Sequence, residues 1–162
     1  MNNIVLIGFM GSGKSSIGRA LAKEKGMYFV DTDALIESFE RQKIRSMFEQ
    51  KGEAYFRELE KKCFEWLSAN VSNAVISTGG GMPTVIDDFS KLGKTIYLKV
   101  DFDTLLERLK AEEFDKRPLF KDLEFARKIF ETREPIYTKK AEYVADANVD
   151  FEKVLKEVSS KA

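Results

Sequence analysis

Short apolar runs alternate with stretches of helical periodicity along the whole chain. The run Ile4-Val5-Leu6-Ile7 ends at Gly8 and suits a strand that is buried on both faces. Similar runs predict four more strands, at 27–30, 74–77, 95–100 and 143–145. All five runs have the length of short strands, and the longer stretches between them are expected to be helical.

Apolar residues recur at helical spacing between these runs. One long helical stretch, 32–69, is expected to break near Lys51-Gly52, and its second part places Phe56, Leu59, Cys63 and Trp66 on one face. A helix beginning at Leu123 is expected to be kinked or broken near Pro135. The remaining predicted helices cover 15–25, 84–91, 102–110 and 151–158.

Strands that alternate with helices predict an α/β fold, with a parallel sheet covered by helices on both faces. The chain has 162 residues, which suits a single domain spanning 1–162, and it contains no repeat or linker. No apolar run approaches the roughly 20 residues of a membrane helix, and the N-terminus lacks the charged start of a signal peptide. We therefore expect a cytoplasmic protein that does not contact a membrane.

Composition removes several classes of function. The 27 basic and 27 acidic residues give zero net charge, which argues against nucleic-acid binding. The absence of histidine excludes Ser-His-Asp and Cys-His catalysis and a histidine-ligated zinc. The single cysteine, Cys63, cannot form an internal disulfide and is interpreted as a small apolar helix residue.

One motif indicates a nucleoside triphosphate site. Residues 8–15, Gly-Phe-Met-Gly-Ser-Gly-Lys-Ser, match the phosphate-binding pattern G-x-x-x-x-G-K-[ST] between a predicted strand and a predicted helix. The backbone from Gly11 through Gly13 to Ser16 would point N–H groups at the phosphates. Lys14 would bridge the β- and γ-phosphates, and the Ser15 hydroxyl would ligate Mg²⁺. The alternative is an ordinary glycine-rich turn, which the flanking elements disfavour.

Two carboxylates follow the second predicted strand, at Asp31 and Asp33. Ligands of open α/β sheets bind beyond the carboxyl ends of the strands, so these groups should lie near the phosphates. One could hold Mg²⁺ through water, and the other could accept the proton of an attacking hydroxyl. Helix capping is the simpler interpretation, but it needs only one of them.

Further charged and glycine-rich segments come later in the chain. On a helix, Glu53 and Glu60 lie four and three residues from Arg57, and this stretch alone reads as a surface row of ion pairs. Three consecutive glycines, 79–81, follow the third predicted strand and would let a ligand approach the backbone. Arg117 and Arg133 add two cations after the fourth strand.

Together, these segments resemble the shikimate kinase family in order and spacing. The resemblance rests on the phosphate loop, Asp31-Thr32-Asp33, Gly-Glu-x-x-Phe-Arg-x-x-Glu at 52–60, Ser-Thr-Gly-Gly-Gly at 77–81, Arg117-Pro118-Leu119 and Arg133 to Tyr137. It covers about residues 3–158. It implies a three-layer α/β/α fold around a five-stranded parallel sheet, like that of nucleoside-monophosphate kinases, and phosphoryl transfer from ATP to the 3-hydroxyl of shikimate in the chorismate pathway.

The resemblance also implies roles for individual residues. Asp33 would bind the shikimate hydroxyls and take the proton, and Arg57 and Arg133 would hold the shikimate carboxylate, with Glu60 orienting Arg57. Asp31 would act with Ser15 at Mg²⁺ through water. The backbone of Gly79, Gly80 and Gly81 would hold the acceptor, between apolar walls formed by Phe48 and Phe56. Residues 31–60 would form the acceptor-binding region.

The polar stretch at about 111–119 resembles a mobile lid, whose Arg117 would reach the phosphates on closure. One position departs from the family: Lys110 stands where an arginine usually packs on adenine. A lysine stem covers the ring without a planar stacking surface, so we expect weaker dependence on the base. The expected partners are ATP and shikimate, and the expected state is a monomer.

Two other classes of function remain open at this stage. A gluconate kinase shares the phosphate loop and the fold, but should lack the set formed by Arg57, the three glycines and Arg133. A nucleotide-binding regulator would keep the fold and lose the chemistry, and the intact charged residues argue against it.

Overall fold

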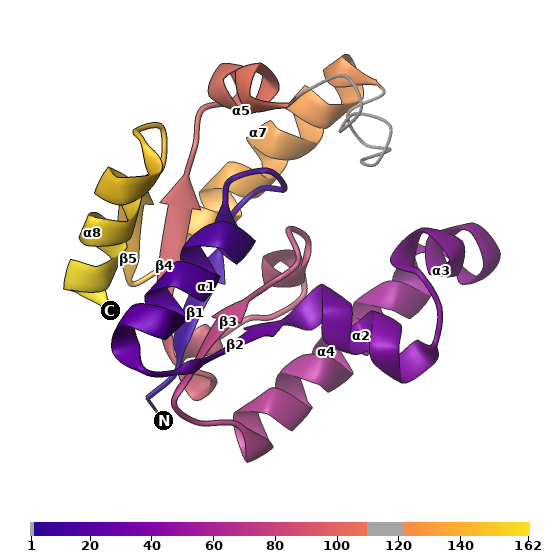
Figure 1. Cartoon of the computed structure of the whole chain (residues 1–162). Coiled ribbons are helices and arrows are strands. Elements are labelled where there is room, and N and C mark those ends of the chain that lie inside the picture. The colour runs from indigo at the N-terminus through magenta and orange to yellow at the C-terminus, as the bar shows by residue number, and fades with distance from the viewer. Residues whose placement is uncertain (1, 110–121) are drawn as a thin grey trace.

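The computed structural model describes residues 2–109 and 122–162 and contains the predicted parallel sheet (Figure 1). Its five strands stand in the order β2-β3-β1-β4-β5, and every neighbouring pair is parallel. Val5 on the central strand lies opposite Ile76 on one side and Thr95 on the other. The strands are β1 (Ile4–Ile7), β2 (Tyr28–Asp31), β3 (Ala74–Ser77), β4 (Lys94–Lys99) and β5 (Tyr143–Asp146).

α-Helices connect successive strands, as the alternating pattern predicted, except between β3 and β4. They are α1 (Lys14–Lys25), α2 (Thr32–Glu40), α3 (Ile44–Lys51), α4 (Glu53–Asn70), α5 (Phe102–Arg108), α7 (Leu123–Lys140) and α8 (Phe151–Lys161). Helices α1 and α8 pack side by side against one face of the sheet, while α7 and the C-terminal half of α4 cover the other (Figure 1). The three-layer α/β/α architecture is therefore confirmed.

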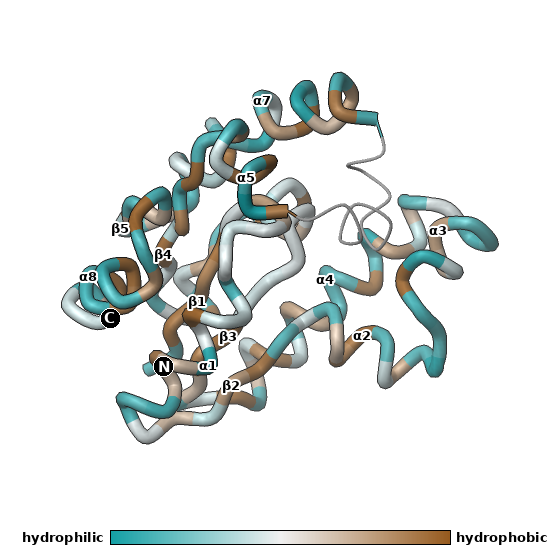
Figure 2. Tube along the Cα trace, turned by 45° about the horizontal axis from the view of Figure 1, so that its top comes forward, coloured by the Kyte–Doolittle hydropathy of each residue, from teal (hydrophilic) through white to brown (hydrophobic). Residues whose placement is uncertain are grey.

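The main core lies where the sheet meets these helices. All four residues of β1 and all four of β3 are buried, which explains why both strands read as apolar runs, broken only by Ser77 at the end of β3 (Figure 2). Helices α2, α3 and α4 form a lobe beside the sheet, with a smaller core of their own (Figure 1). Ile36, Met47, Phe56 and Leu59 make up this second core.

Several predicted boundaries are wrong, for local reasons. The stretch 32–69 breaks twice, because Arg41 adopts a left-handed conformation and ends α2 before the expected break at Gly52. The predicted helix 84–91 is replaced by two 3₁₀ turns, Met82–Thr84 and Phe89–Lys91. Ile86, Phe89 and Leu92 are buried along this segment.

Two helix predictions near the end of the chain also need correction. Helix α5 ends at Arg108 rather than at 110, and the Arg108 side chain donates to the carbonyl of Ala147. Helix α7 runs through Pro135 without the break that proline suggested. Pro135 and Glu131, the residue four positions earlier, are both exposed, so water can bond the carbonyl that loses its partner.

The fold gathers the predicted site segments at one edge of the sheet. The phosphate loop follows β1, Asp31 ends β2, and the three glycines come shortly after β3. Thr78 ties two of these segments together, because its backbone N–H donates to the carbonyl of Leu6 at 3.1 Å. In parallel strands, the carboxyl ends meet at one edge, so segments far apart in sequence become neighbours.

Candidate functional site

The loop between β1 and α1 has the backbone geometry that phosphate binding requires. Gly11 and Gly13 have φ angles of 83° and 95°, a region that residues with a Cβ rarely adopt. Gly13 caps α1 without a side-chain hydrogen bond, which leaves the first N–H groups of the helix facing the loop. Ser12 is buried, Ser15 is partly buried and Ser16 is exposed.

Lys14 lies along this loop rather than pointing away from it. Its side chain is buried, and its Nζ donates to the carbonyls of Gly8 at 2.7 Å and Phe9 at 3.0 Å. These bonds place the ammonium group within the turn of the loop, where a phosphate would meet it. The same loop thus supplies the backbone donors and the positive charge of an anion site.

Asp31 performs the capping task that was the simpler interpretation of the Asp-Thr-Asp segment. Its Oδ1 accepts from the N–H of Ala34 at 3.1 Å and caps α2. Its Oδ2 faces the other way and accepts a long hydrogen bond, 3.4 Å, from the hydroxyl of Ser15. The Asp31 side chain therefore both caps α2 and lies next to the phosphate loop. Its Oδ2 and the hydroxyl oxygen of Ser15 together suit Mg²⁺, a cation that prefers oxygen ligands.

Asp33 does not cap the helix, and its carboxylate points into the protein. Its Oδ1 is buried and has no hydrogen-bond partner among the described residues. Burial, together with the negative charge of Asp31, raises the pKa of Asp33 to about 6, although Lys14 acts in the opposite direction. An orphaned, buried carboxylate oxygen beside a phosphate loop is the feature that a proton acceptor for a hydroxyl would show.

Arg57 on α4 is held between two glutamates. Glu53 accepts from its Nε and Nη2, at 3.3 and 3.2 Å, and Glu60 accepts from its Nη1. Glu60 is completely buried, and burial raises its pKa to about 7 against the opposing effect of Arg57. The interpretation of this stretch as a surface row of ion pairs is therefore wrong, since surface pairs expose both partners.

The three glycines let charged side chains approach the backbone after β3. A Cβ at Gly79 would lie 2.5 Å from Oδ1 of Asp33, and one at Gly81 would overlap the guanidinium of Arg57. A Cβ at Gly80 would meet Nη1 of Arg133 at 3.6 Å, which is an ordinary contact. These distances show that Asp33, Arg57 and Arg133 converge on a single stretch of backbone.

Phe48 and Phe56 lie beside this cluster. Their ring centroids are 5.1 Å apart, and the guanidinium carbon of Arg57 is 5.9 Å from the first ring centroid and 5.5 Å from the second. The rings shield one side of the arginine from water and support it through cation–π attraction. Both rings therefore lie against Arg57, and their role as walls for an acceptor stays a prediction.

Sequence reasoning left two contacts of this cluster unassigned. The hydroxyl of Thr32 accepts from the N–H of Gly79 at 3.1 Å, and the hydroxyl of Tyr137 donates to the carbonyl of Gly80 at 2.6 Å. Both residues stood inside the quoted segments, yet no spacing rule distinguishes such contacts from ordinary packing. The predicted residues Lys110 and Arg117, and the lid at about 111–119, lie outside the described residues.

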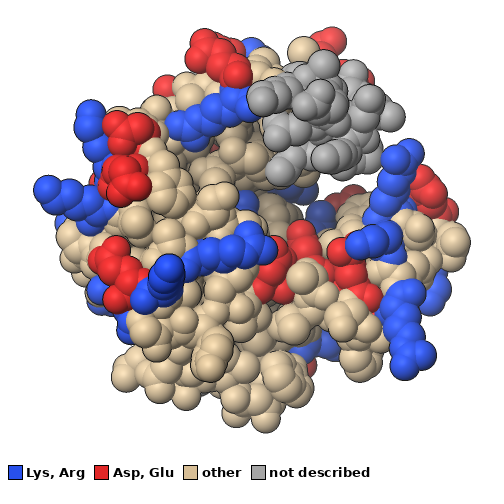
Figure 3. Space-filling view, viewed as in Figure 1, with Lys and Arg blue, Asp and Glu red and all other residues tan. Residues whose placement is uncertain are grey.

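The charged face between the lobe of α2–α4 and the rest of the molecule is hollowed, with acidic side chains at its rim (Figure 3). No group of three or more acidic or cysteine side chains within 2–109 and 122–162 could hold a metal by itself. None of the described helices could cross a bilayer.

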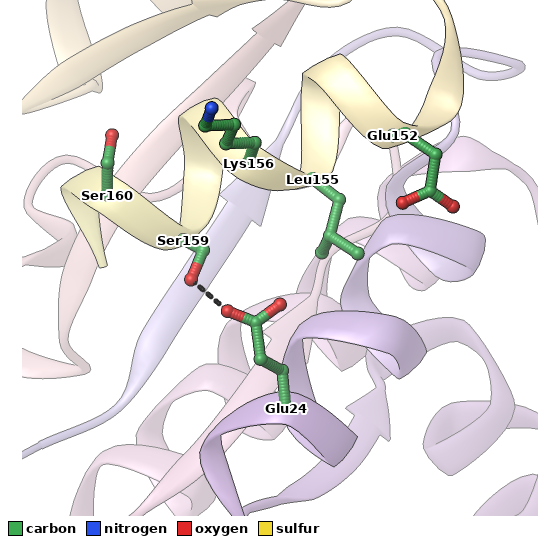
Figure 4. Close-up of a pocket in the computed structure, with 6 residues that line it drawn as sticks. All are labelled: Glu24, Glu152, Leu155, Lys156, Ser159 and Ser160. Carbon is green, nitrogen blue, oxygen red and sulfur yellow. Dashed lines mark hydrogen bonds between the residues drawn. The ribbon is translucent and has the colours of Figure 1, made fainter.

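Two cavities lie apart from this cluster. One, of about 340 Å³, is shallow and lies between α1 and α8, where Ser159 donates to Glu24 at the far end of α1 from Lys14 (Figure 4). The other, of about 480 Å³, is an apolar groove between α2 and α4. Trp66 lines this groove together with Leu59, so the two share one face of α4 as predicted, although Trp66 is 57% exposed. Cys63 also lines it, and burial raises the pKa of its thiol to about 11, as suits an inert helix residue.

Comparison with known proteins agrees with the geometry. The sequence matches the shikimate kinase family over residues 10–162. The shikimate kinase of Helicobacter hepaticus is 44% identical over 158 residues, which cover 98% of this chain and 94% of that protein.

Solved structures give the same result. The crystal structure of shikimate kinase from Bacteroides thetaiotaomicron superimposes with a TM-score of 0.86 at 32% identity, covering 99% of this chain and 95% of that one. Shikimate kinase from Acinetobacter baumannii, solved in complex with shikimate, gives 0.83 at 29% identity, covering 99% and 90%.

Proposed function

The chain belongs to the shikimate kinase family, and we propose on that basis a division of labour among its residues. The reaction is transfer of the γ-phosphoryl group of ATP to the 3-hydroxyl of shikimate, which gives shikimate 3-phosphate and ADP in the chorismate pathway. One observation supports the assignment most directly. Asp33, Arg57 and Arg133 converge on the backbone of Gly79–Gly81, at the same sheet edge as the phosphate loop.

On the donor side, the loop would hold ATP. The N–H groups from Gly11 to Ser16 would bind phosphate oxygens, and Lys14 would neutralise charge that builds up during transfer. Mg²⁺ would bind through Ser15, with Asp31 acting through water, and would offset the charge of the phosphates when bound. The hydroxyl oxygen of Ser15 and Oδ2 of Asp31 are 3.4 Å apart, which supports a role for both residues at one Mg²⁺ ion.

On the acceptor side, two arginines and one aspartate would fix shikimate. Arg57 and Arg133 would bind its carboxylate with their planar guanidinium groups, between the walls formed by Phe48 and Phe56. Asp33 would bind the reacting hydroxyl and take its proton. With a pKa of about 6, it is mostly ionised at pH 7 and so free to accept that proton.

The remaining assignments concern segments and context. We propose that residues 31–60 form the acceptor-binding region and that about 111–119 form a lid, with Arg117 reaching the phosphates and Lys110 covering the adenine. We also propose a monomer that acts in the cytoplasm.

The decisive experiment measures ADP release with Mg-ATP and four acceptors: shikimate, gluconate, nucleoside monophosphates and water. We expect turnover with shikimate alone to exceed the rate with water. Turnover with gluconate but not with shikimate would refute the assignment. ATP binding without turnover on any acceptor would favour a nucleotide-binding regulator.

A further inference from the structure

A buried tyrosine connects two parts of the proposed acceptor site. Tyr137 lies on α7, one helical turn after Arg133, and is fully buried. Its hydroxyl donates to the carbonyl of Gly80 at 2.6 Å, a short bond to the middle of the glycine segment. Helix α7 is thereby joined to a loop that lies 57 residues earlier in the chain.

The same hydroxyl also lies beside the guanidinium of Arg133, whose positive charge opposes the rise in the pKa of Tyr137. Arg133 and Gly80 are close, since a Cβ at Gly80 would lie 3.6 Å from Nη1 of Arg133. One hydroxyl therefore donates to the Gly80 backbone and faces the arginine that lies beside that backbone. Because its bond to Gly80 is directional, the hydroxyl presents its oxygen to the guanidinium in a fixed position relative to Gly80.

Packing alone does not require this hydroxyl. The ring of Tyr137 packs on that of Tyr97, with centroids 5.2 Å apart, and a phenylalanine would keep this contact. Burial raises the pKa of Tyr137 to about 12, so the proton donated to Gly80 stays in place throughout the neutral range. A buried hydroxyl with two partners specifies geometry more than it adds stability.

We propose that Tyr137 is a positioning residue, which sets the orientation of Arg133 relative to Gly80 and so the affinity of the site for the shikimate carboxylate. The proposal rests on the function proposed above. It predicts that removing the hydroxyl weakens acceptor binding far more than ATP binding, because the hydroxyl itself meets Gly80 and Arg133 and not the phosphate loop.

The test compares two tyrosine-to-phenylalanine variants. Tyr137→Phe should raise the Kd of shikimate, measured by calorimetry, and its KM by about 3–10-fold, the effect of one lost hydrogen bond. Its kcat and its KM for ATP should change less than about twofold. Tyr97→Phe is the matched control, because its buried hydroxyl has no hydrogen-bond partner among the described residues. It should leave shikimate binding unchanged.

A double variant tests whether Tyr137 acts through Arg133. In an Arg133→Ala background, Tyr137→Phe should weaken shikimate binding no further, because the group that it orients is gone. If Tyr137→Phe raised the Kd of shikimate by the same factor in both backgrounds, the proposal would be overturned. So would a Tyr137→Phe enzyme with a reduced kcat but unchanged shikimate Kd and KM, since that pattern indicates a purely structural role.

Two further controls keep the outcome clear. If Tyr137→Phe does not fold, a tyrosine fluorinated beside the hydroxyl keeps the ring and weakens the acceptor for Arg133; an unchanged Kd would then overturn the proposal. Failure of the wild-type protein to bind or phosphorylate shikimate would refute the proposed function itself. Normal wild-type activity with no effect at Tyr137 would refute only this inference.

Discussion

The donor and acceptor sides of the site are built in different ways. The phosphate loop comes from eight consecutive residues, and its shape depends on local backbone geometry at Gly11 and Gly13. The acceptor side comes from five segments, the start of α2, the Phe48 turn of α3, the N-terminal part of α4, the loop after β3 and the middle of α7. One side is a local motif and the other is a product of tertiary structure.

The difference extends to electrostatics. On the acceptor side, burial raises the pKa of Asp33 to about 6 and that of Glu60 to about 7. Carboxylates that are ionised in such surroundings destabilise the folded state at neutral pH. The ionised carboxylates of the acceptor side thus lower the stability of the fold while they serve the reaction. Substitutions there should therefore change stability and catalytic rate in opposite directions.

The largest expected effect is that of Asp33→Asn. Loss of the proton acceptor should lower kcat by about 10²–10⁴-fold and leave the KM for ATP within about threefold. Steady-state kinetics with both substrates would measure this. An unchanged kcat would remove Asp33 from the chemistry.

The same variant should be more stable than the wild type at pH 7. The pKa of Asp33 is higher in the folded state, about 6, than its ordinary value of 3.8, so folding favours the protonated form. Its stabilising contribution is complete below pH 3.8 and is lost as the pH rises through about 6. Asparagine is uncharged at every pH and should add about 1–3 kcal/mol at pH 7. Thermal unfolding at pH 7 and pH 4 would show a gain at the first pH only.

Arg133→Ala should come next and should affect the acceptor side alone. Loss of charge-assisted hydrogen bonds to the carboxylate should raise the KM for shikimate by about 10–100-fold. The KM for ATP should change less than about threefold. Equal losses for both substrates would contradict the separation between the two sides.

A pair of glycine substitutions tests how closely the acceptor side is packed. Gly79→Ala places a methyl group 2.5 Å from Oδ1 of Asp33, whereas Gly80→Ala meets its nearest atom, the backbone nitrogen of Met10, at 3.5 Å. We expect Gly79→Ala to lower kcat by about 10-fold, because it displaces the carboxylate, and Gly80→Ala to cost less. Similar kcat values for the two variants would show that Asp33 moves aside freely.

The structure of the donor side could be predicted from the sequence more completely than that of the acceptor side. The five strands and the phosphate loop were predicted from local pattern, because a buried run and a glycine-rich motif carry their own physical signature. The burial of Glu60 was not, since its charged neighbours look the same on a surface helix. Its burial depends on how α4 packs in the lobe of α2–α4.

The errors in the helices have the same origin. The break at Arg41 needs a left-handed non-glycine residue, which local propensity does not reveal. The continuity of α7 through Pro135 depends on which face of the helix meets solvent. Residue types fix what is favoured locally, and tertiary contacts then decide among the alternatives.

The smallest expected effect concerns the pH dependence of kcat/KM for shikimate. Protonation of Asp33 should reduce activity below about pH 6, since only the ionised form accepts a proton. Burial is the main cause of the raised pKa, and the negative charges of Asp31 and then Glu37 also contribute. Glu37 lies one turn after Asp33 on α2 and accepts from the N–H of Ile44 at 3.0 Å, a bond that glutamine can keep.

Glu37→Gln should therefore move the acid limb toward lower pH, by less than about one pH unit, without changing the maximal rate. Glu40→Gln is the matched control, because Glu40 lies further along α2 and does not contribute to the pKa of Asp33. Titration of the substrates is common to all three proteins, so only the difference between them reports on the enzyme. If the acid limb of the profile does not move in Glu37→Gln, the limb reports on a group other than Asp33. Glu60, with a pKa of about 7, would then be the first group to test.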